Sequence, residues 1–408
     1  MIRFLTAGES HGKALNVIID GFPSNINISE AYINSELSRR MLGYGRGLRM
    51  KIESDKAEII SGIRFEKTTG SPISLFIKNN DWANWKDILD VNQNEIECAK
   101  ITIPRPGHAD LNGISKYNLD DIRDSIERSS ARETAARVAA GSIARKFLKE
   151  FGIEIGSYVE SIGGIYSEEN FTDKLLENKT GKKFAADSLN KWADKSSVRV
   201  LDSIHEEKII RKIKIAKKKG DTLGGTFIVT ATGVPVGLGS FTQYDKRLDA
   251  DIAQAFISIN AVKGVEIGSA FKGAGLFGSE IHDEIIKKGN NLLRKTNHYG
   301  GIEGGISNGM PFIVRGAMKP IATLMSPIES VNLSGMKKVL ARRERSDFTA
   351  VPACAVIGES MLAWVIAKHF LEKFGGDSLE EVKDNYIAYT GKLFYRIFDN
   401  FKDGKSKS

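Results

Sequence analysis

The stretch DDIRDSIERSSARETAARVAAGSIARKFLKE, residues 120 to 150, decides the fold that we expect for this chain. It opens with acidic residues, Gly152 follows its end, and apolar side chains recur through it at helical spacing. The pair Ser129-Ser130 is a place where the helix can break. Because many of its residues are alanines, other elements can pack closely on more than one side. We therefore predict a long central helix that is buried on two faces.

Short β-rich runs precede and follow this helix in the sequence. They cover residues 2–7, 15–21, 50–55, 57–65 and 71–79 before it, and residues 220–237 and 310–320 after it. Turn residues divide the runs at residues 50–55, 57–65 and 71–79, which favours an antiparallel meander of these three. Helical patterns occupy residues 247–260, 352–375 and 378–394. Both halves of the chain therefore combine strands with helices.

The chain is long enough to bury a large core. With 408 residues and 41% hydrophobic residues, we predict a single domain over residues 1–400. Residues 160–220 are rich in lysine and weakly periodic, which favours a peripheral helical insertion. Residues 401–408 are expected to form a disordered tail.

The sequence lacks features of membrane and secreted proteins. No run of about 18 apolar residues is present, and the first residues have no secretory signal pattern. We therefore expect a cytoplasmic protein with no membrane partner. Cys98 and Cys354 lie far apart, without the spacing of a zinc site or a disulfide framework. No metal site is predicted.

The formal charge of +8 favours anionic partners. Lysine runs between residues 174 and 219 indicate solvated helix faces rather than a nucleic-acid surface. A nucleic-acid-binding protein is the alternative interpretation. It would show aromatic residues interleaved with the basic ones and salt-dependent binding, and the sequence lacks that interleaving.

The arginines are distributed differently from the lysines. Arg39, Arg40, Arg46 and Arg49 surround three glycines within the segment SRRMLGYGRGLRMKIE, residues 38 to 53. Glycines permit close approach of the backbone, and guanidinium groups match phosphate and carboxylate oxygens. This segment predicts a site for a multiply charged anion.

GESHG, residues 8 to 12, has the letters of a nucleophile elbow. The context disfavours a serine hydrolase. A nucleophile elbow lies within a parallel sheet whose other strands come partly from earlier in the sequence, and only seven residues precede Gly8. In the other interpretation His11 acts as a general acid or base. A purely structural histidine in a glycine-rich turn is also possible.

A second histidine lies in ITIPRPGHADLNG, residues 101 to 113. Its prolines predict a rigid loop that presents Arg105, His108 and Asp110, and rigid loops suit functional residues. The alternative is an ordinary turn in which Asp110 caps the next segment.

Two arginines of the long helix, Arg128 and Arg132, are spaced by about one turn. We expect both on one face, beside Ser129 and Ser130, as a cradle for an anion. Ordinary pairing with neighbouring glutamates is the alternative. Three further segments can hold anions or approach a flat ligand: residues 319–323, 341–347 and 300–309. Neither a Walker motif nor a dinucleotide fingerprint in its proper context is present.

Nine motifs, in order, resemble those of the chorismate synthase family. They are GESHG (8–12), RRMLGYGRGLRMKIE (39–53), RPGHADL (105–111), RSSARETAARVAAG (128–141), GDTLGG (220–225), INAVKGVEIG (259–268), GGISNG (304–309), KPIAT (319–323) and RSDFTAVPA (345–353). Two positions depart from the usual family pattern, Leu48 in the arginine-rich loop and Ala322 in KPIAT.

The resemblance implies an α+β fold, a β-α-β sandwich with a helical layer between two antiparallel sheets, assembled as a homotetramer. It implies the anti-1,4-elimination of phosphate from 5-enolpyruvylshikimate 3-phosphate, which gives chorismate in the last step of the shikimate pathway. Reduced FMN is required in that family although there is no net redox change.

The resemblance also implies roles for individual residues. Substrate contacts are expected from Arg40, Arg46, Arg49, Arg105 and Arg132. FMN contacts are expected from Arg128, Ser129, Ser130, Asn260, Ala261, Gly304, Lys319, Pro320, Ile321, Ala322, Thr323 and Arg345. His11 resembles the acid that protonates the leaving phosphate, His108 the acid that serves the flavin, and Asp347 the group that assists proton removal.

Two interpretations are open for how the flavin is reduced: by a separate reductase or by this protein itself. We expect a monofunctional enzyme that relies on a separate flavin reductase, with NADPH acting only indirectly, because no reductase domain or dinucleotide fingerprint is present. A flavin-dependent oxidoreductase, or a bifunctional family member that reduces its own FMN, is the alternative.

Overall fold

The computed structural model describes residues 2–46, 54–89, 91, 99–168, 170–180, 184–288, 291–343 and 347–402. The N-terminal sheet contains β1 (Arg3–Ala7), β2 (Ala14–Asp20), β6 (Ile73–Lys78) and β3 (Ala57–Ser61), in the order β1-β2-β6-β3 and antiparallel throughout. Helix α1 (Glu30–Met41) separates β2 from β3. The runs at residues 57–65 and 71–79 of the expected meander pair antiparallel as β3 and β6, and β6 also pairs with β2. Of the strand expected at residues 50–55, residues 50–53 lie outside the described part of the chain.

The predicted long helix is present, and it breaks at the serine pair. Helix α4 (Ile122–Ser129) ends there, a 3₁₀ turn follows at Ala131–Glu133, and α5 (Thr134–Lys149) continues. Ser130 is extended, with φ −61° and ψ 141°, and its hydroxyl accepts a hydrogen bond from the amide of Arg132 at 3.3 Å. The break is therefore built into the local sequence, because serine side chains compete with the helix for backbone amides.

Helix α5 packs tightly against the long helix α12 (Val351–Phe374). The alanines of α5 are buried, and a Cβ built on Gly141 would lie only 2.4 Å from the Cβ of Ser360. The expected burial on two faces is confirmed, because α5 also contacts β2 on one side and β7 on the other. Among the described helices, α12 alone is long and apolar enough to cross a membrane, but 94% of that stretch is buried inside the protein.

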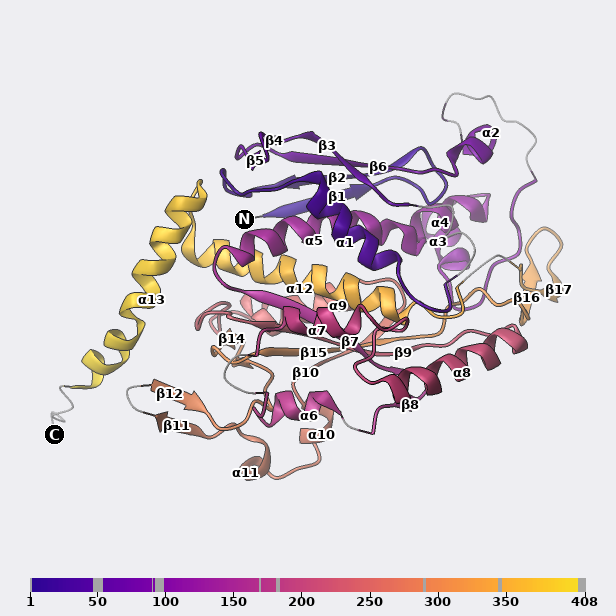
Figure 1. Ribbon diagram of the computed structural model, residues 1–408. Helices are drawn as coiled ribbons and strands as arrows, with labels where there is room; N and C mark the ends of the chain where they lie inside the picture. Colours follow the sequence, from indigo (N-terminus) through magenta and orange to yellow (C-terminus); the bar gives the residue numbers. More distant parts are fainter. Residues whose placement is uncertain are drawn as a thin grey trace.

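The second sheet has the order β10-β15-β9-β7-β8 and is also antiparallel. Its strands are β10 (Val262–Ile267), β15 (Phe312–Met318), β9 (Gly225–Thr232), β7 (Glu154–Ile162) and β8 (Ile165–Tyr166). Figure 1 shows α1, α5, α9 (Leu248–Ile257) and α12 between the two sheets. The α+β class is confirmed.

Residues 160–220, the predicted peripheral insertion, form mostly helices. Residues 160–162 complete β7, and the helices α6 (Phe171–Leu176), α7 (Asp187–Ala193) and α8 (Ser203–Lys219) follow. Figure 1 shows α6 and α8 on the side of the second sheet away from α12. A small core that includes Leu175, Leu189 and Ile228 joins α6 and α7 to this sheet, whereas Ile209 and Ile213 of α8 belong to the main core. The segment is tied to the centre of the protein, because buried Arg199 forms an ion pair with Glu359 of α12.

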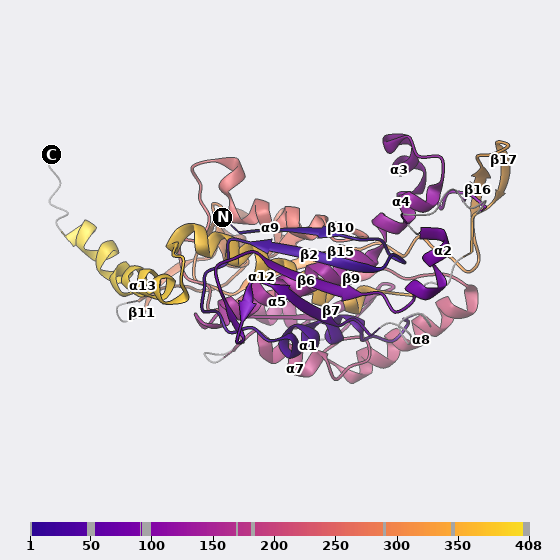
Figure 2. The same ribbon diagram turned by 90° about the horizontal axis from the view of Figure 1, so that it is seen from above.

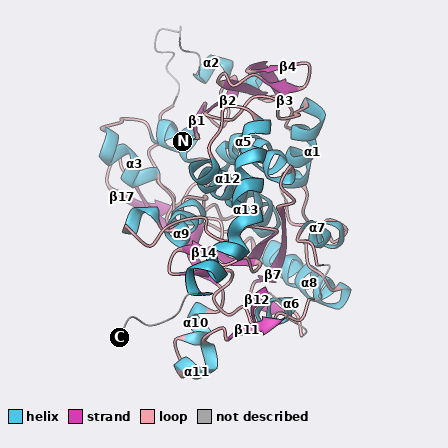
Figure 3. Ribbon diagram, turned by 90° about the vertical axis from the view of Figure 1, so that its left-hand side faces the viewer, coloured by secondary structure: helices cyan, strands magenta, loops and turns pink. Residues whose placement is uncertain are grey.

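The remaining elements gather at opposite ends of the molecule. Figure 2 shows α2 (Lys86–Leu89), α3 (Asp110–Tyr117), α4, one end of α8, and the hairpin of β16 (Glu329–Asn332) and β17 (Lys337–Leu340) at one end. Helix α13 (Leu379–Lys402) lies at the other end (Figures 1 and 3). Short elements complete the chain: β4 (Ile63–Arg64), β5 (Lys67–Thr68), α10 (Ala270–Gly273), α11 (Gly278–Ile281), β11 (Ile285–Lys288), β12 (Asn291–Arg294), β13 (Ile302–Glu303) and β14 (Ile306–Ser307). Residues 403–408 of the expected tail lie outside the described part.

Candidate active site

His11 lies in the turn between β1 and β2 and is held by Glu127 of α4. Its Nδ1 lies 2.8 Å from Glu127 Oε1, and its amide donates to Oε2 at 2.7 Å. The imidazole stacks on Trp85, with ring centroids 3.9 Å apart. Because an ionised carboxylate only accepts, Nδ1 carries the hydrogen, and Nε2 is the atom that can exchange a proton.

The serine beside His11 does not form a hydrolase site. Ser10 is buried, and its hydroxyl donates to the hydroxyl of Ser130 at 3.0 Å. GESHG joins two antiparallel strands rather than a strand and a helix. This context differs from that of a nucleophile elbow.

Two of the predicted substrate arginines meet on one carboxylate. Arg40 Nη1 donates to Asp55 Oδ2 at 3.2 Å, and Arg132 Nη1 contacts Asp55 Oδ1. Arg40 also donates to the hydroxyl of Thr134 and to the carbonyl of Ala131, at the helix break. All three charged side chains are at least nine-tenths buried. The arrangement places two guanidinium groups together in a site of low solvent exposure.

A third arginine is organised by the 101–109 loop. Arg105 donates through Nε and Nη2 to Asp110, at 2.8 and 3.0 Å, and through Nη1 to the hydroxyl of Thr323 at 3.1 Å. Nδ1 of His108 lies 2.5 Å from Asp110 Oδ1. Burial raises the pKa of Asp110, but the hydrogen bonds from His108 and Arg105 outweigh it and hold that pKa far below its usual range. Asp110 does not cap α3 through its side chain, so the capping alternative is wrong.

Residues expected to hold the flavin converge from three segments. Asn260 Nδ2 donates to the carbonyl of Ser129 at 3.0 Å, and the Lys319 amide donates to the carbonyl of Ala261 at 2.9 Å. Lys319 Nζ donates to the carbonyl of Gly107, next to His108. Burial and the nearby charge of Lys263 lower the pKa of Lys319. These positions form one contiguous cluster beside the 101–109 loop.

Residues 319–323 are also held by the GDTLGG segment. The hydroxyl of Thr222 donates to the carbonyl of Ile321 at 2.7 Å. A Cβ built on Gly224 would lie 2.3 Å from the carbonyl oxygen of Met318, so only glycine permits this approach. Pro320 is exposed, whereas Ile321 and Ala322 are partly buried.

Asp347, the remaining catalytic candidate, pairs with Arg46 of the glycine-rich loop. Arg46 Nε lies 3.2 Å from Asp347 Oδ2, and the amide of Phe348 donates to the carbonyl of Gly45 at 2.8 Å. Leu223 donates to the carbonyl of Phe348. Asp347 and Phe348 together thus join the 43–46 loop to the GDTLGG segment. Arg49, Leu48 and Arg345 lie outside the described residues.

Arg128 and Arg132 do not share a face, contrary to expectation. The helix ends between them, so Arg132 turns inward to Asp55 whereas Arg128 donates to the carbonyls of Thr6 and Gly8. Of the neighbouring glutamates, Glu127 binds His11 and Glu133 accepts from Arg137.

Two further positions lie apart from this cluster. Arg39 points away from Arg40 and binds Glu359 through Nη1 and Nη2, at 2.8 and 2.9 Å. Gly304 lies in the turn between β13 and β14, ahead of β15, whereas Lys319 follows β15, a strand that spans roughly 20 Å at about 3.3 Å per residue. The amide of Leu248 at the start of α9 donates to Gly305, next to Gly304. Within the described chain, Gly304 is not brought to the rest of the flavin cluster.

Comparison with known proteins decides the family. The sequence profile described as chorismate synthase matches residues 2–371. The chain belongs to the chorismate synthase family. It is 52% identical to a chorismate synthase of Chlorobaculum tepidum, over 97% of this chain and 100% of that protein, and 54% identical to one of Chloroherpeton thalassium, over 96% and 100%. A crystal structure of a chorismate synthase superposes with a TM-score of 0.77, at 44% identity, over 97% of this chain and 98% of that one.

Three side chains of the chorismate synthase fold were not identified as site residues from the sequence. Asp55 follows the arginine-rich loop, Glu127 precedes Arg128, and Trp85 lies in the segment DWANWKD, residues 81 to 87. Tryptophans in an otherwise polar segment were the available signal for Trp85. No local signal marks Asp55, because its partners Arg40 and Arg132 are 15 and 77 residues away.

Proposed function

We propose that this protein is a chorismate synthase, which removes phosphate and a proton from 5-enolpyruvylshikimate 3-phosphate by anti-1,4-elimination to give chorismate. This is the last step of the shikimate pathway. The supporting observation is the meeting of Arg40 and Arg132 at the helix break, where Ser130 bonds to Ser10, the neighbour of His11. The site therefore combines clustered cations with a titratable group, as the loss of phosphate requires.

The guanidinium groups neutralise the substrate, which carries one phosphate and two carboxylates. Asp55 holds Arg40 and Arg132 together through two ion pairs. A bound anion takes over part of that role, because charge-assisted bonds from arginine favour oxygens of phosphate and carboxylate. Arg105 adds a third cation, whose orientation Asp110 and Thr323 determine. Arg46 and Arg49 complete the proposed substrate set.

His11 is the proposed acid at the leaving group. Glu127 holds Nδ1 and the backbone amide, and Trp85 limits rotation of the ring. Nε2 then delivers a proton to the departing phosphate, whose charge the arginines stabilise as it develops. Asp347 is the proposed group that assists removal of the substrate proton, and its ion pair with Arg46 fixes the position of its carboxylate.

The observed cluster fits a flavin. Asn260 Oδ1 is buried and has no hydrogen-bond partner among the described residues, which suits an acceptor for a ligand hydroxyl or amide. Ala261 has φ of +67°, a strained conformation for a residue other than glycine that is common at ligand sites. Arg128, Ser129, Ser130, residues 319–323 and Arg345 complete the proposed set, whereas Gly304 lies apart from them within the described chain and is left out. Reduced FMN, when bound, lends electron density to the reacting framework and recovers it, so there is no net redox change.

His108 is the proposed proton donor toward the flavin side of the site. Asp110 accepts its Nδ1 hydrogen and sets the orientation of the ring. Nε2 is therefore the atom that can hold or move a proton. Lys319 contacts the same loop at Gly107 and adds a positive charge beside it.

The wider setting follows from the family. We propose the β-α-β sandwich architecture of chorismate synthases for the observed layers, a homotetrameric assembly and a cytoplasmic location. A separate reductase is proposed to supply reduced FMN, with NADPH as its indirect electron source.

An anaerobic assay tests the function. Purified protein, photoreduced FMN and 5-enolpyruvylshikimate 3-phosphate are mixed, and phosphate and chorismate are followed together. Equal amounts of both products are expected, with none when FMN stays oxidised. Phosphate release without chorismate would contradict the proposal. Aerobic turnover with NADPH and FMN in the absence of a reductase would instead show a bifunctional enzyme.

A further inference from the structure

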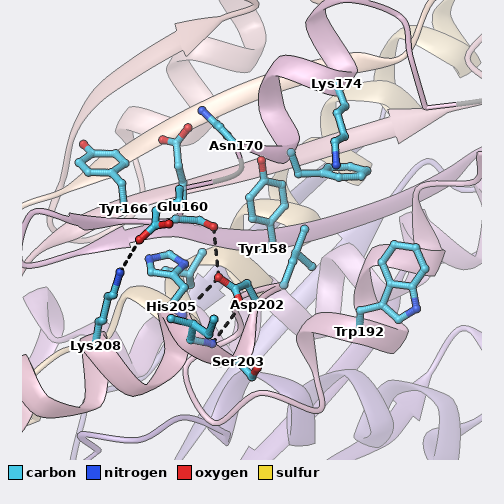
Figure 4. Close-up of a pocket in the computed structure, with 16 residues that line it drawn as sticks. Tyr158, Glu160, Tyr166, Asn170, Lys174, Trp192, Asp202, Ser203, His205 and Lys208 are labelled. Atoms are coloured by element: carbon cyan, nitrogen blue, oxygen red, sulfur yellow. Dashed lines mark hydrogen bonds and ion pairs between the residues drawn. The ribbon is translucent and has the colours of Figure 1, made fainter.

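The hairpin of β16 and β17 lies directly against the candidate active site. It follows residues 319–323 in the chain and precedes Asp347, so both of its ends lead into segments of that site. Figure 2 shows the hairpin at the end of the molecule that holds α3 and α4. The cavity of about 720 Å³ between α6 and α8 (Figure 4) lies elsewhere, and none of the residues assigned to the active site lines it.

Three hydrogen bonds join the hairpin to the 101–109 loop. The Ser330 hydroxyl donates to the carbonyl of Pro104 at 2.5 Å, and the Leu333 amide donates to the carbonyl of Thr102 at 3.0 Å. The hydroxyl of Thr102 donates in turn to Asn332 Oδ1 at 2.9 Å. The bonds of Ser330 and Asn332 join residues that are 226 and 230 positions apart, so only tertiary packing brings them together.

The loop depends on these bonds because it belongs to no regular element. Residues 101–105 form neither a helix nor a strand, and Pro104 and Pro106 have no amide hydrogen to donate. A buried carbonyl that lacks a donor is costly, so such groups need a partner from another segment. The hairpin supplies that partner for the carbonyls of Thr102 and Pro104.

Ser330 holds one side of a peptide unit whose other side belongs to the active site. The carbonyl of Pro104 and the amide of Arg105 share one planar peptide unit, so fixing the first orients the second. That amide donates to Asp110 Oδ2 at 2.9 Å, and the same carboxylate binds the Arg105 guanidinium and His108 Nδ1. The peptide unit is therefore held at both ends, by Ser330 and by Asp110.

Asn332 binds the same loop from the end of β16. Its Oδ1 accepts from the Thr102 hydroxyl and also from the Ser334 amide at 3.1 Å, so one side chain both shapes the turn and holds the loop. Ser330 and Asn332 are alternate residues of β16 and therefore face the same side of the strand, toward the loop. Val331, between them, faces the other side and is exposed.

We infer that Ser330 and Asn332 are positioning residues of the active site, which act on Arg105 and His108 through the backbone of residues 102–104. The inference rests on the proposed function, because that function gives Arg105 its role in substrate binding. Ser330 orients the peptide unit between residues 104 and 105, and Asn332 holds the loop two residues earlier, at Thr102.

The local effect is measured without substrate or flavin, by hydrogen exchange of the Arg105 amide in the full chain. Ser330→Ala is expected to speed that exchange about 3- to 10-fold, because the peptide unit loses the hydrogen bond at its carbonyl. The amide of buried Val159, which donates to the carbonyl of Arg199, should keep its rate. Ser330→Thr retains a hydroxyl and should return the Arg105 rate to within about 2-fold of the parent. Equal Arg105 rates in the parent and in Ser330→Ala would overturn the inference.

Anaerobic kinetics with photoreduced FMN measure the effect on the reaction. Ser330→Ala should raise the KM for substrate about 3- to 10-fold and change kcat less than about 2-fold, because Arg105 is assigned to binding rather than to proton transfer. Ser330→Thr should restore the KM. The matched control Ser334→Ala removes a hydroxyl from the exposed turn of the same hairpin and should leave both constants within about 2-fold. An unchanged KM in Ser330→Ala, or an equal rise in Ser334→Ala, would contradict a positioning role.

The role of Asn332 is tested by combining it with Thr102. Asn332→Ala and Thr102→Val each remove one partner of their hydrogen bond, and each should raise the KM about 3-fold or more. The double variant should be no worse than Asn332→Ala, since both changes remove the same bond, whereas additive losses would exclude that bond as the cause. Val331→Ala, on the opposite face of β16, is the control and should leave the KM within about 2-fold.

The two kinds of measurement separate this inference from the proposed function. If the parent protein forms no chorismate, the proposed function fails, and the exchange rate of the Arg105 amide still decides whether Ser330 positions the loop. If chorismate forms and that exchange rate does not respond to Ser330→Ala, the function stands and the positioning role is wrong.

Discussion

Glu127 binds His11 at two points, through the imidazole Nδ1 at 2.8 Å and through the backbone amide at 2.7 Å. The carboxylate is 4% exposed and the imidazole 16% exposed, so solvent contributes little to this arrangement. One side chain of α4 thereby determines both the position of the turn between β1 and β2 and the orientation of the ring.

Replacing Glu127 by glutamine is expected to lower kcat about 10- to 100-fold, and His11→Ala at least about 100-fold, because proton transfer from a positioned histidine contributes on that scale. The KM for substrate should change less than about 3-fold, since Glu127 acts through His11. Anaerobic kinetics with photoreduced FMN measure both constants. The double variant should be no slower than His11→Ala alone, and an additive loss would show that Glu127 acts independently.

Asp55→Ala is expected to destabilise the protein by about 3 to 5 kcal/mol, because it leaves Arg40 and Arg132 buried together without their shared carboxylate. Inorganic phosphate should raise the Tm of this variant more than that of the parent, since an anion can replace the missing charge. Asp20→Ala, which breaks the exposed pair with Arg3, is the control and should cost at most about 1 kcal/mol. Equal phosphate effects in both proteins would argue against an anion site between the two arginines.

Glu359→Gln is expected to lower the free energy of unfolding by about 3 to 5 kcal/mol, since it weakens a buried network. Burial raises the pKa of Glu359, but Arg39 and Arg145 outweigh it and hold that pKa far below its usual range. Arg39 adjoins Arg40, so a rise in the KM for substrate is also expected. Urea denaturation measures the stability, with exposed Glu380→Gln as a control within about 0.5 kcal/mol.

The pH dependence of stability tests Asp110. Its pKa is lower in the folded protein than in the unfolded chain, so the folded state binds fewer protons between the two values and stability rises with pH there. The contribution of Asp110 to the free energy of unfolding is therefore complete above about pH 4, which is the pKa of an aspartate in the unfolded chain. This contribution is lost as the pH falls toward the lower pKa of Asp110 in the folded protein. Urea denaturation between about pH 3 and 7 should show the difference between parent and Asp110→Asn shrinking at the acidic end. A difference independent of pH would contradict the lowered pKa.

Asn260→Ala is expected to weaken binding of FMN about 10-fold, because the buried Oδ1 acceptor has no partner among the described residues and is assigned to the ligand. Quenching of flavin fluorescence measures the affinity. Asn308→Ala, which alters an amide that donates to Glu303, is the control and should leave it unchanged. Unaltered affinity in Asn260→Ala would remove this residue from the cofactor site.

Local signals were sufficient for the elements that build the core. The alanine-rich run, its opening aspartates and the serine pair predicted α4, the break and α5, because helix propensity and capping depend on neighbouring residues. The order of the first sheet could not be predicted in the same way. Whether β6 pairs with β2 or lies at an edge depends on contacts between segments that are far apart in the sequence.

The arginines show the same limit at the level of the site. The sequence by itself determined that cations and glycines cluster in one loop and that an anion is the natural partner of such a loop. Only the tertiary structure decided that Arg39 turns to Glu359 while its neighbour Arg40 turns to Asp55. Successive residues of a helix point about 100° apart, so the side chains of Arg39 and Arg40 enter different layers of the protein. The carboxylate that each of them meets there depends on how segments distant in the sequence pack together.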